Sequence, residues 1–232
     1  MPVPRTLRHD FFKTWTPEMA YVLGFFAADG SMLRNGRGAH FVEFTVVDRI
    51  VLEHIQQYTN SSHRISTRER GGNTKTAYRL QIGSKEWFTD LSRLGFTQHK
   101  SKTLQFPSVP RKYFSDFVRG YFDGDGCVYF GEHYAKDRGK MRFVFTTSFT
   151  CGNRTFLEEL HASLLQVGLL GGRVAVKGDK SGYELVLSHN DSLALYRLMY
   201  HTGKISFPYL PRKREKLERA IQVLGLGKRL RE

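Results

Sequence analysis

Apolar and polar positions recur along this chain with two periods, and each period predicts one kind of element. Alternation of apolar and polar residues predicts strands at 40–47, 63–70, 75–82, 142–149, 171–178 and 183–188. Helical spacing of apolar residues predicts helices at 52–58, 84–95, 156–168, 189–200 and 211–224. Capping residues agree: Thr16 precedes Pro17 at a helix start, and Asp48 and Asn153 stand just before two predicted helices. The pattern therefore predicts an α+β protein.

The same order of elements occurs twice, because the chain contains an internal repeat. Residues 21–31 read YVLGFFAADGS, and residues 117–127 read FVRGYFDGDGC. Each copy opens a series of helix, strand, strand, helix, strand, strand and helix. The predicted fold is therefore two tandem αββαββα repeats related by a pseudo-twofold axis. The predicted segments are a first repeat at 15–95, a linker at 96–110, and a second repeat with a C-terminal helix at 111–224.

Small residues line one side of each repeated segment. Ala20, Gly24 and Ala28 are spaced by four residues, as are Gly120 and Gly124 in the second copy. Residues at this spacing share one face of a helix, and side chains this small allow two helix backbones to approach closely. We therefore expect both segments to be helices that pack against each other.

Each strip of small residues ends in an Asp-Gly pair, Asp29-Gly30 and Asp125-Gly126. Glycine is common where a helix ends, so one such pair alone would indicate a plain helix stop. An aspartate there faces the negative end of the helix dipole, and packing two such helices brings two carboxylates together. A bound cation would compensate both costs, and carboxylate and carbonyl oxygens suit Mg²⁺ or Ca²⁺. Paired acids with metal between them suit phosphodiester hydrolysis.

The composition of the chain indicates which class of molecule it binds. The 232 residues include 36 Lys and Arg against 22 Asp and Glu, a formal net charge of +14. A domain this basic favours a polyanion such as nucleic acid. Cys127 and Cys151 are too few for a disulfide framework, and the sequence shows no signal peptide and no membrane-length apolar run. We therefore expect a reducing, non-secreted location, in the cytoplasm or an organellar matrix, and no membrane partner.

The segments 22–30 (VLGFFAADG) and 118–126 (VRGYFDGDG) resemble the signature of the LAGLIDADG family. The resemblance extends over about residues 15–220 and fits the monomeric, two-repeat branch of homing endonucleases. The eighth motif position, which is the metal-binding acid of the family, falls on Asp29 and Asp125. The resemblance implies the backbone carbonyls of Ala28 and Gly124 as further ligands. Asp123, at the sixth position, is expected to pack or cap rather than bind metal.

The resemblance also implies a lysine near each metal site, and Lys100 and Lys213 match best. Either lysine could stabilise charge that develops on the phosphate, or could simply bind phosphate or remain a solvated charge. The implied cofactor is Mg²⁺, with Mn²⁺ or Ca²⁺ as substitutes. Ca²⁺ is expected to bind without supporting fast cleavage.

Alternation along the strands predicts where DNA would lie. Ile65 fixes one face of its strand, which leaves Arg68 on the other face. One face of each sheet is basic and polar, and two such antiparallel sheets side by side would form a saddle that enters successive major grooves. An ordinary solvated sheet face is the alternative. The second sheet is less basic, with Glu184 and Val186 on this face, so the half-sites should differ. The residues expected to contact DNA are Arg34, Arg37, Arg64, Ser66, Arg68, Arg70, Lys75, Arg79, Gln81, Lys140, Arg142, Arg173, Lys177 and Lys180.

Together these features favour a site-specific endonuclease that cuts both strands of DNA. The family implies 3′ overhangs and a long, asymmetric target. The alternatives are an RNA maturase that acts on intron RNA, or a catalytically inactive DNA-binding regulator of the same fold. The presence of both Asp29 and Asp125 favours the nuclease. The endonuclease part of an intein is less favoured, because no splicing blocks flank the motifs and the two repeats account for nearly all of the chain.

Overall fold

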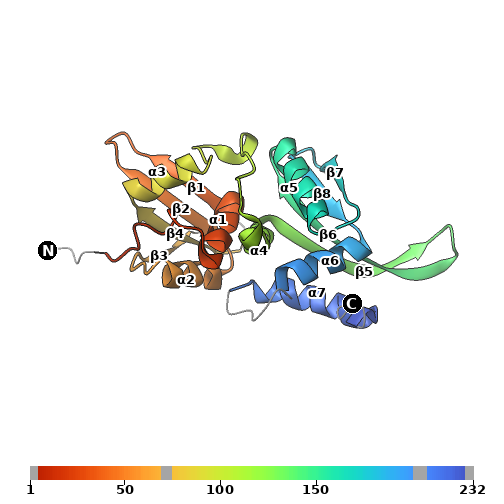
Figure 1. Cartoon of the computed structure of the whole chain (residues 1–232). Helices are drawn as coiled ribbons and strands as arrows, with labels where there is room; N and C mark the ends of the chain where they lie inside the picture. The colour runs from red at the N-terminus through yellow and green to blue at the C-terminus, as the bar shows by residue number, and fades with distance from the viewer. Residues whose placement is uncertain (1–4, 69–74, 201–207, 228–232) are drawn as a thin grey trace. The chain divides into compact units, whose positions relative to one another are not determined.

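A computed structural model describes residues 5–68, 75–200 and 208–227 (Figure 1). The helices are α1 (Pro17–Asp29), α2 (Arg49–Tyr58), α3 (Lys85–Arg93), α4 (Phe114–Asp125), α5 (Arg154–Gln166), α6 (His189–Tyr200) and α7 (Pro211–Val223). The strands are β1 (Gly30–Arg34), β2 (His40–Val46), β3 (Ile65–Arg68), β4 (Ala77–Gly83), β5 (Gly126–Ala135), β6 (Lys140–Cys151), β7 (Arg173–Val176) and β8 (Tyr183–Leu187). Short 3₁₀ helices are η1 (Lys100–Lys102) and η2 (Arg111–Tyr113).

The described residues form two compact units, each with its own antiparallel sheet. The first unit holds 5–68, 75–124 and 208–210, and the second holds 125–200 and 211–227. The strand order is β1-β2-β4-β3 in the first sheet and β5-β6-β8-β7 in the second. The two orders are equivalent, and each helix and strand of the predicted αββαββα repeats is present. The predicted fold class is therefore confirmed.

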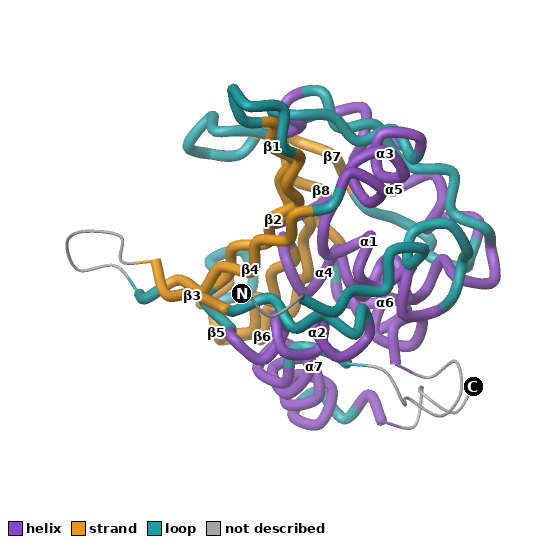
Figure 2. Tube along the Cα trace, turned by 90° about the vertical axis from the view of Figure 1, so that its left-hand side faces the viewer, coloured by secondary structure: helices purple, strands orange, loops and turns teal. Residues whose placement is uncertain are grey.

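In the first unit the helices cover one face of the sheet and leave the other face open (Figure 2). Val42, Phe44 and Val46 alternate along β2 and are buried on the helix side. Phe25 and Phe26 of α1 pack on Phe44, with ring centroids 6.4 and 5.6 Å apart. Burial of each such side chain stabilises the fold by about 1.5–3 kcal/mol, so the period-two pattern decides which face of the sheet remains open.

The second unit is built in the same way around its own core. Phe149 of β6 and Leu185 and Leu187 of β8 are fully buried, together with Phe156 of α5. Helices α5 and α6 lie against β6 and β8. The opposite face of this sheet again carries no helix in the described part of the unit (Figure 2).

The second sheet differs from the first by a long arm. Strands β5 and β6 pair along the whole of Gly126–Ala135, whereas β8 pairs with β6 only over Thr147–Cys151. The far part of this hairpin extends away from the rest of its unit (Figure 1). The repeat predicted two strands here but bounds for only one of them, 142–149, because most side chains of the arm are exposed or half-buried and leave a weak period-two pattern. Tyr134 and Met141 are accordingly exposed near its tip.

Helix caps form largely as predicted. The side chain of Thr16 accepts a hydrogen bond from the Met19 amide at 3.1 Å, and that of Asn153 accepts one from the Thr155 amide at 3.0 Å. Asp48 occupies the N-cap position of α2 with an extended backbone. In the segment 96–110, Phe96, Lys100 and Leu104 are buried, whereas Thr97, Gln98 and His99 are exposed. No helix in the described part of the chain is long and apolar enough to cross a membrane.

Candidate functional site

The motif helices α1 and α4 are in direct backbone contact. A Cβ atom on Gly24 would lie 2.1 Å from the carbonyl oxygen of Phe117, and one on Gly120 would lie 2.0 Å from that of Tyr21. Real Cβ atoms do not approach a backbone this closely, so only glycine fits either position. The predicted packing of the small-residue strips is confirmed, and the contact lies within the first unit, which holds α1 and the part of α4 up to Gly124.

This packing brings the end of α1 onto the second motif. A Cβ on Gly124 would lie 2.3 Å from the Cβ of Ala28 and 3.3 Å from Oδ2 of Asp29. The Asp29 carboxylate thus lies against the Gly124 backbone, and Gly124 directly precedes Asp125 in the chain. Asp29 itself is half-buried.

Gly30 is needed for space and not for an unusual backbone conformation. Its φ of −86° and ψ of 155° are extended, and its amide donates to the carbonyl of Phe26. A Cβ here would lie 2.1 Å from Cδ2 of the Phe26 ring. Gly30 therefore does not adopt the left-handed backbone conformation that often ends a helix at glycine, and the chain passes directly from α1 into β1.

Lys100 reaches the same helix end from a distant part of the chain. Its side chain is only 6 % exposed, and its ammonium donates to the carbonyl oxygens of Ala27 at 2.6 Å and Ala28 at 3.4 Å. The ammonium also lies 5.7 Å from the ring centroid of Phe26. A cation at the C-terminus of a helix is stabilised by the helix dipole. The structure thus places Lys100 beside the carbonyl of Ala28 and next to Asp29.

Asp125 and Lys213 belong to the second unit. Asp125 is the last residue of α4, and its carbonyl accepts a hydrogen bond from Oγ1 of Thr150 at 3.3 Å. Lys213 is buried in the first turn of α7. Helix α7 lies against β5, the strand that begins directly after Asp125. Burial of an ammonium group costs free energy unless the group is paired, so the Lys213 side chain requires polar partners where it lies.

Asp123 ties helices together, as the resemblance implied for the sixth motif position. Its Oδ2 accepts hydrogen bonds from the Tyr21 hydroxyl at 2.8 Å and from the Leu210 amide at 2.9 Å. The side chain is almost fully buried. Asp123 therefore links α4 to α1 and to the segment that leads into α7.

A buried ion pair that the sequence analysis did not predict fixes the start of α4. Nη2 of Arg119 donates to Oδ1 of Asp116 at 2.6 Å, and its Nε donates to the carbonyl of Pro208 at 3.3 Å. Burial raises the pKa of Asp116, and the nearby Arg119 only partly offsets this rise. The sequence signal for this ion pair was an acid and a base three residues apart within a predicted helix.

The atoms at the end of α1 suit a hard divalent cation. The Asp29 carboxylate and the Ala28 carbonyl belong to adjacent residues and offer oxygen alone, which is the donor type preferred by Mg²⁺ and Ca²⁺. Across 5–68, 75–200 and 208–227, no three His, Cys, Asp or Glu side chains gather as a metal-binding group.

The open face of the first sheet carries several of the predicted DNA-contacting residues. The register pairs Ser66 with Arg79, and Arg68 and Gln81 lie on the same face of neighbouring strands. Ile65 pairs with Leu80 on the opposite, helix-covered face. The predicted assignment of these residues to one face is correct.

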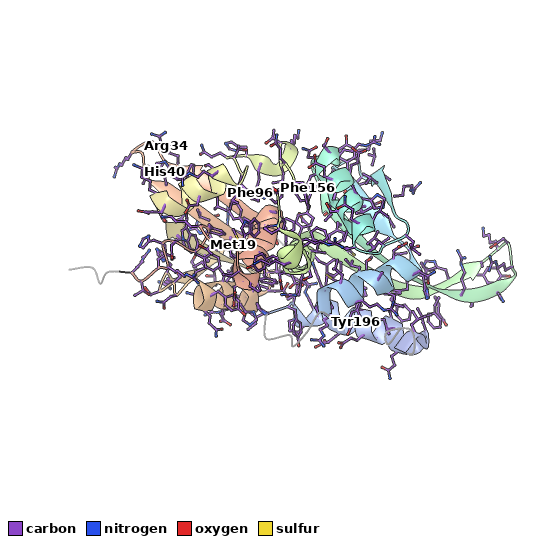
Figure 3. All side chains as sticks on the ribbon, viewed as in Figure 1. Met19, Arg34, His40, Phe96, Phe156 and Tyr196 are labelled. Atoms are coloured by element: carbon purple, nitrogen blue, oxygen red, sulfur yellow. The ribbon has the colours of Figure 1, made fainter. Side chains whose placement is uncertain are left out.

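The remaining predicted residues of this half lie at the margins of the sheet. Arg64 precedes β3, Lys75 precedes β4, and Arg37 lies in the turn between β1 and β2, all exposed. Arg34 shares the face of Met32 and pairs with His40 at the end of the hairpin (Figure 3). Arg34 is therefore on the helix side and can meet DNA only beyond the sheet's end. Arg70 lies outside the described residues.

One acidic residue on this open face was missed. Glu43, in the centre of β2, pairs with Gln81 across the sheet and is only 6 % exposed. It forms ion pairs with Arg68 and Arg79, at 3.8 and 3.7 Å. Period-two alternation places Glu43 on this face, but its partners depend on strand register and are not visible in the sequence.

The second sheet presents a less basic open face. Arg142 pairs with His133, and Arg173 pairs with Val186. Lys140 and Arg142 lie exposed on the arm. Lys177 extends the face past β7 but forms an ion pair with Asp179 at 3.8 Å. The predicted Lys180 lies exposed in the β7–β8 turn, with a left-handed φ of 56°.

An aromatic pair on this face was not predicted from the sequence. Tyr129 pairs with Thr146, and its hydroxyl contacts Nε2 of His133. Both side chains lie on the same side of the arm as Arg142. Flat side chains beside basic residues suit contact with bases or sugars, and alternation along β5 was the available signal.

The fold and these sites define a duplicated α+β protein with an acid at the end of each of two packed helices and a basic open face on each sheet. The family model described as the LAGLIDADG-like domain matches residues 16–94 and again 115–198. The chain therefore belongs to the LAGLIDADG family, in its two-motif branch.

Solved structures of two-motif meganucleases have the same fold. The K262A mutant of I-SmaMI is 12 % identical, with a TM-score of 0.62 over 93 % of this chain and 94 % of that chain. I-AabMI bound to uncleaved DNA is 17 % identical, with a TM-score of 0.62 over 92 % of each chain. I-SmaMI bound to an uncleaved DNA target with calcium ions is 12 % identical, with a TM-score of 0.61 over 94 % of each chain.

Curated relatives are much longer proteins. A segment of a probable translation initiation factor IF-2 of Thermococcus kodakarensis is 32 % identical over 156 residues, which is 63 % of this chain and 12 % of that protein. A segment of the RNA polymerase subunit Rpo1C of Methanocaldococcus jannaschii is 21 % identical over 225 residues, which is 96 % of this chain and 22 % of that protein. The chain thus spans about an eighth and about a fifth of these proteins, and their named activities belong to the longer chains.

Proposed function

We propose that this protein is a site-specific endonuclease that hydrolyses one phosphodiester bond in each strand of double-stranded DNA. The observation that carries this proposal is the contact of α1 with α4 at Gly24, Gly120 and Gly124. It holds the Asp29 carboxylate against the residue that precedes Asp125. An acid at a helix C-terminus is disfavoured by the helix dipole, so the repetition of this arrangement at Asp29 and Asp125 favours a catalytic use.

Asp29 with the Ala28 carbonyl, and Asp125 with the Gly124 carbonyl, would each hold Mg²⁺. Bound there, Mg²⁺ supplies Lewis acidity toward phosphate oxygens and lowers the pKa of a coordinated water. Mn²⁺ would substitute for it, and Ca²⁺ would support binding without fast cleavage. The calcium-containing complex of I-SmaMI with uncleaved DNA supports this choice of ions.

Lys100 would act on the charge of the substrate. Its ammonium is fixed by the Ala27 carbonyl at 2.6 Å, so it needs little reorganisation to stabilise negative charge that develops on the phosphate. Lys213 would serve the second motif in the same way.

The open faces of the two sheets would contact the DNA on either side of the cleaved bonds. Basic side chains there neutralise phosphates, and Arg and Gln can read base edges. Because the second face is less basic and carries Glu184, the two half-sites would differ, and the target would be long and asymmetric. We further propose that the protein acts as a monomer and leaves 3′ overhangs. The complex of I-SmaMI with cleaved DNA supports a cleaving rather than a binding role.

The experiment begins with selection of bound duplexes from a randomised double-stranded DNA library in Ca²⁺. The selected duplex is then placed in a supercoiled plasmid and incubated with Mg²⁺ and wild type, Asp29→Asn or Asp125→Asn. We expect wild type to linearise the plasmid, and both variants to bind the duplex with nearly wild-type Kd without linearising it. Full cleavage by either variant would exclude the metal-site assignment. Tight binding by wild type without cleavage in Mg²⁺ or Mn²⁺ would make the protein a DNA-binding regulator.

A further inference from the structure

A single buried carboxylate connects the side chains that are expected to read DNA on the first sheet. Ion pairs join Glu43 to Nη1 of Arg68 at 3.8 Å and to Nη1 of Arg79 at 3.7 Å. Nε2 of Gln81 donates to Oε2 of Glu43 at 3.1 Å, and Oγ1 of Thr45 donates to Oε1 at 3.3 Å. Glu43 thus contacts one residue of β3, Arg68, and two residues of β4, Arg79 and Gln81, and lies at the centre of the open face.

Burial decides which members of this cluster can meet a ligand. The Glu43 side chain is 8 % exposed, whereas those of Arg68 and Arg79 are 57 % and 37 % exposed. Both carboxylate oxygens are already engaged. Each guanidinium has five N–H donors, so one ion pair leaves most of its donors directed elsewhere. Glu43 is therefore a support beneath the arginines rather than a group that touches DNA.

We propose that Glu43 is a positioning residue that determines base specificity in the half-site under the first sheet. This inference rests on the proposed function, in which the open face binds DNA. Bidentate reading of a guanine edge requires a guanidinium directed at the base, and the ion pairs with Glu43, at 3.8 and 3.7 Å, keep Arg68 and Arg79 near the centre of the open face before DNA arrives. An unanchored arginine can turn to a phosphate, which gives affinity without sequence information.

The second sheet has no equivalent of this cluster. Gly30 pairs with Phe44 in the first sheet, and Gly126 pairs with Phe149 in the second, which aligns the two registers. Glu43 then corresponds to Ser148, and its partner Gln81 corresponds to Val186.

By the same alignment Arg79 corresponds to Glu184, so an acid replaces a base at this place. The two half-sites should therefore be read with unequal stringency. Positions under the first sheet should tolerate fewer base substitutions than positions under the second.

The test compares wild type with Glu43→Gln and with Glu184→Gln. Both variants remove one negative charge from an open sheet face, but of the two acids only Glu43 forms ion pairs with arginines among the described residues. Each protein is measured against the duplex selected from the randomised library in Ca²⁺, and against every single base-pair substitution of that duplex. Binding is also measured as a function of salt concentration.

We expect Glu43→Gln to bind the selected duplex at least as tightly as wild type, with a salt slope steeper by about 0.9 for each phosphate newly neutralised. Its discrimination should fall about tenfold at positions confined to one half-site, because one fixed base contact is lost. Glu184→Gln releases no arginine, so it should keep the wild-type salt slope and the wild-type discrimination at positions under the first sheet. A merely structural role for Glu43 would instead weaken binding to all duplexes equally.

Wild-type discrimination by Glu43→Gln, or an equal loss in Glu184→Gln, would overturn the inference. If Glu43→Gln fails to fold by circular dichroism, Arg79→Lys replaces it, since it keeps the charge and removes the planar fork. Arg79→Lys should lose discrimination at positions of the same half-site without a steeper salt slope, and unchanged discrimination would again overturn the inference. Failure of wild type to select any duplex would instead overturn the proposed function.

Discussion

Replacement of Gly24 by alanine tests the contact on which the arrangement of the motif helices depends. The new Cβ would lie 2.1 Å from the Phe117 carbonyl oxygen, where ordinary van der Waals contact begins near 3.4 Å. The neighbour is helix backbone, which cannot rotate away, so α1 and α4 must part by about 1.3 Å at this point. Alanine in a helix interior is otherwise favoured over glycine by about 1 kcal/mol. Overpacking a rigid contact costs about 3 kcal/mol, so we expect a net loss of about 2 kcal/mol in the free energy of unfolding.

The assay is urea denaturation followed by tryptophan fluorescence. The chain has two tryptophans, Trp15 and Trp87, and both lie in the first unit. Trp15 stacks on Tyr113, just before α4, with centroids 6.3 Å apart, so the signal reports on this region. Gly36→Ala is the control, because a Cβ there meets no atom within 4 Å. We expect the control to change stability by no more than about 0.5 kcal/mol.

The same substitution should affect catalysis, because it moves Asp29 relative to the second motif. Displacement of a catalytic group by about 1 Å can reduce a rate by about a hundredfold. Plasmid cleavage by Gly24→Ala should fall by this order under conditions in which the protein remains folded. A Gly24→Ala protein that is as stable as wild type, or more stable by the helix propensity of alanine, would refute the reasoning. Unchanged cleavage would show that the helix contact does not control the site.

Three further predictions concern individual groups. Lys100→Met should lower the free energy of unfolding by about 1–3 kcal/mol, because the buried Ala27 carbonyl loses its donor. The same substitution should reduce the rate of DNA cleavage far more than the affinity for DNA. Cleavage at the wild-type rate would exclude a catalytic role for the lysine. Burial lowers the pKa of His63 below its ordinary value of 6.5, and the nearby Arg5 and His9 lower it further. The stability that neutral His63 contributes is therefore fully present above pH 6.5 and is lost as the pH falls through the lowered pKa. The urea midpoint should therefore fall on acidification, and His63→Gln should weaken this dependence; an unchanged pH profile in the variant would contradict the assignment. Ca²⁺ at ten times its Kd should raise the free energy of unfolding by about 1.4 kcal/mol in wild type, and an equal rise in Asp29→Asn would show that the ion binds elsewhere.

Much of the architecture followed from the sequence, because it is encoded in local or periodic signals. The duplicated motif and the alternation of apolar residues predicted the tandem αββαββα repeats. Small residues spaced by four predicted the helix pair, and the structure explains them by backbone contacts at Gly24 and Gly120. The face that carries Arg68 and Arg79 followed from alternation alone. These features need only the period of a helix or a strand.

The tertiary structure decided the contacts between residues that are distant in the chain. Lys100 meets the carbonyl of Ala27 across 73 residues, and no periodicity relates the two positions. Glu43 could not be distinguished from any other polar residue of a sheet face until the register placed Gln81 and Arg79 beside it. Strand register and helix packing are set by the fit of the whole core, and side chains on different elements meet only as a result of that fit. The sequence therefore determined which residues carry charge and which face they share, whereas the fold determined which charges touch.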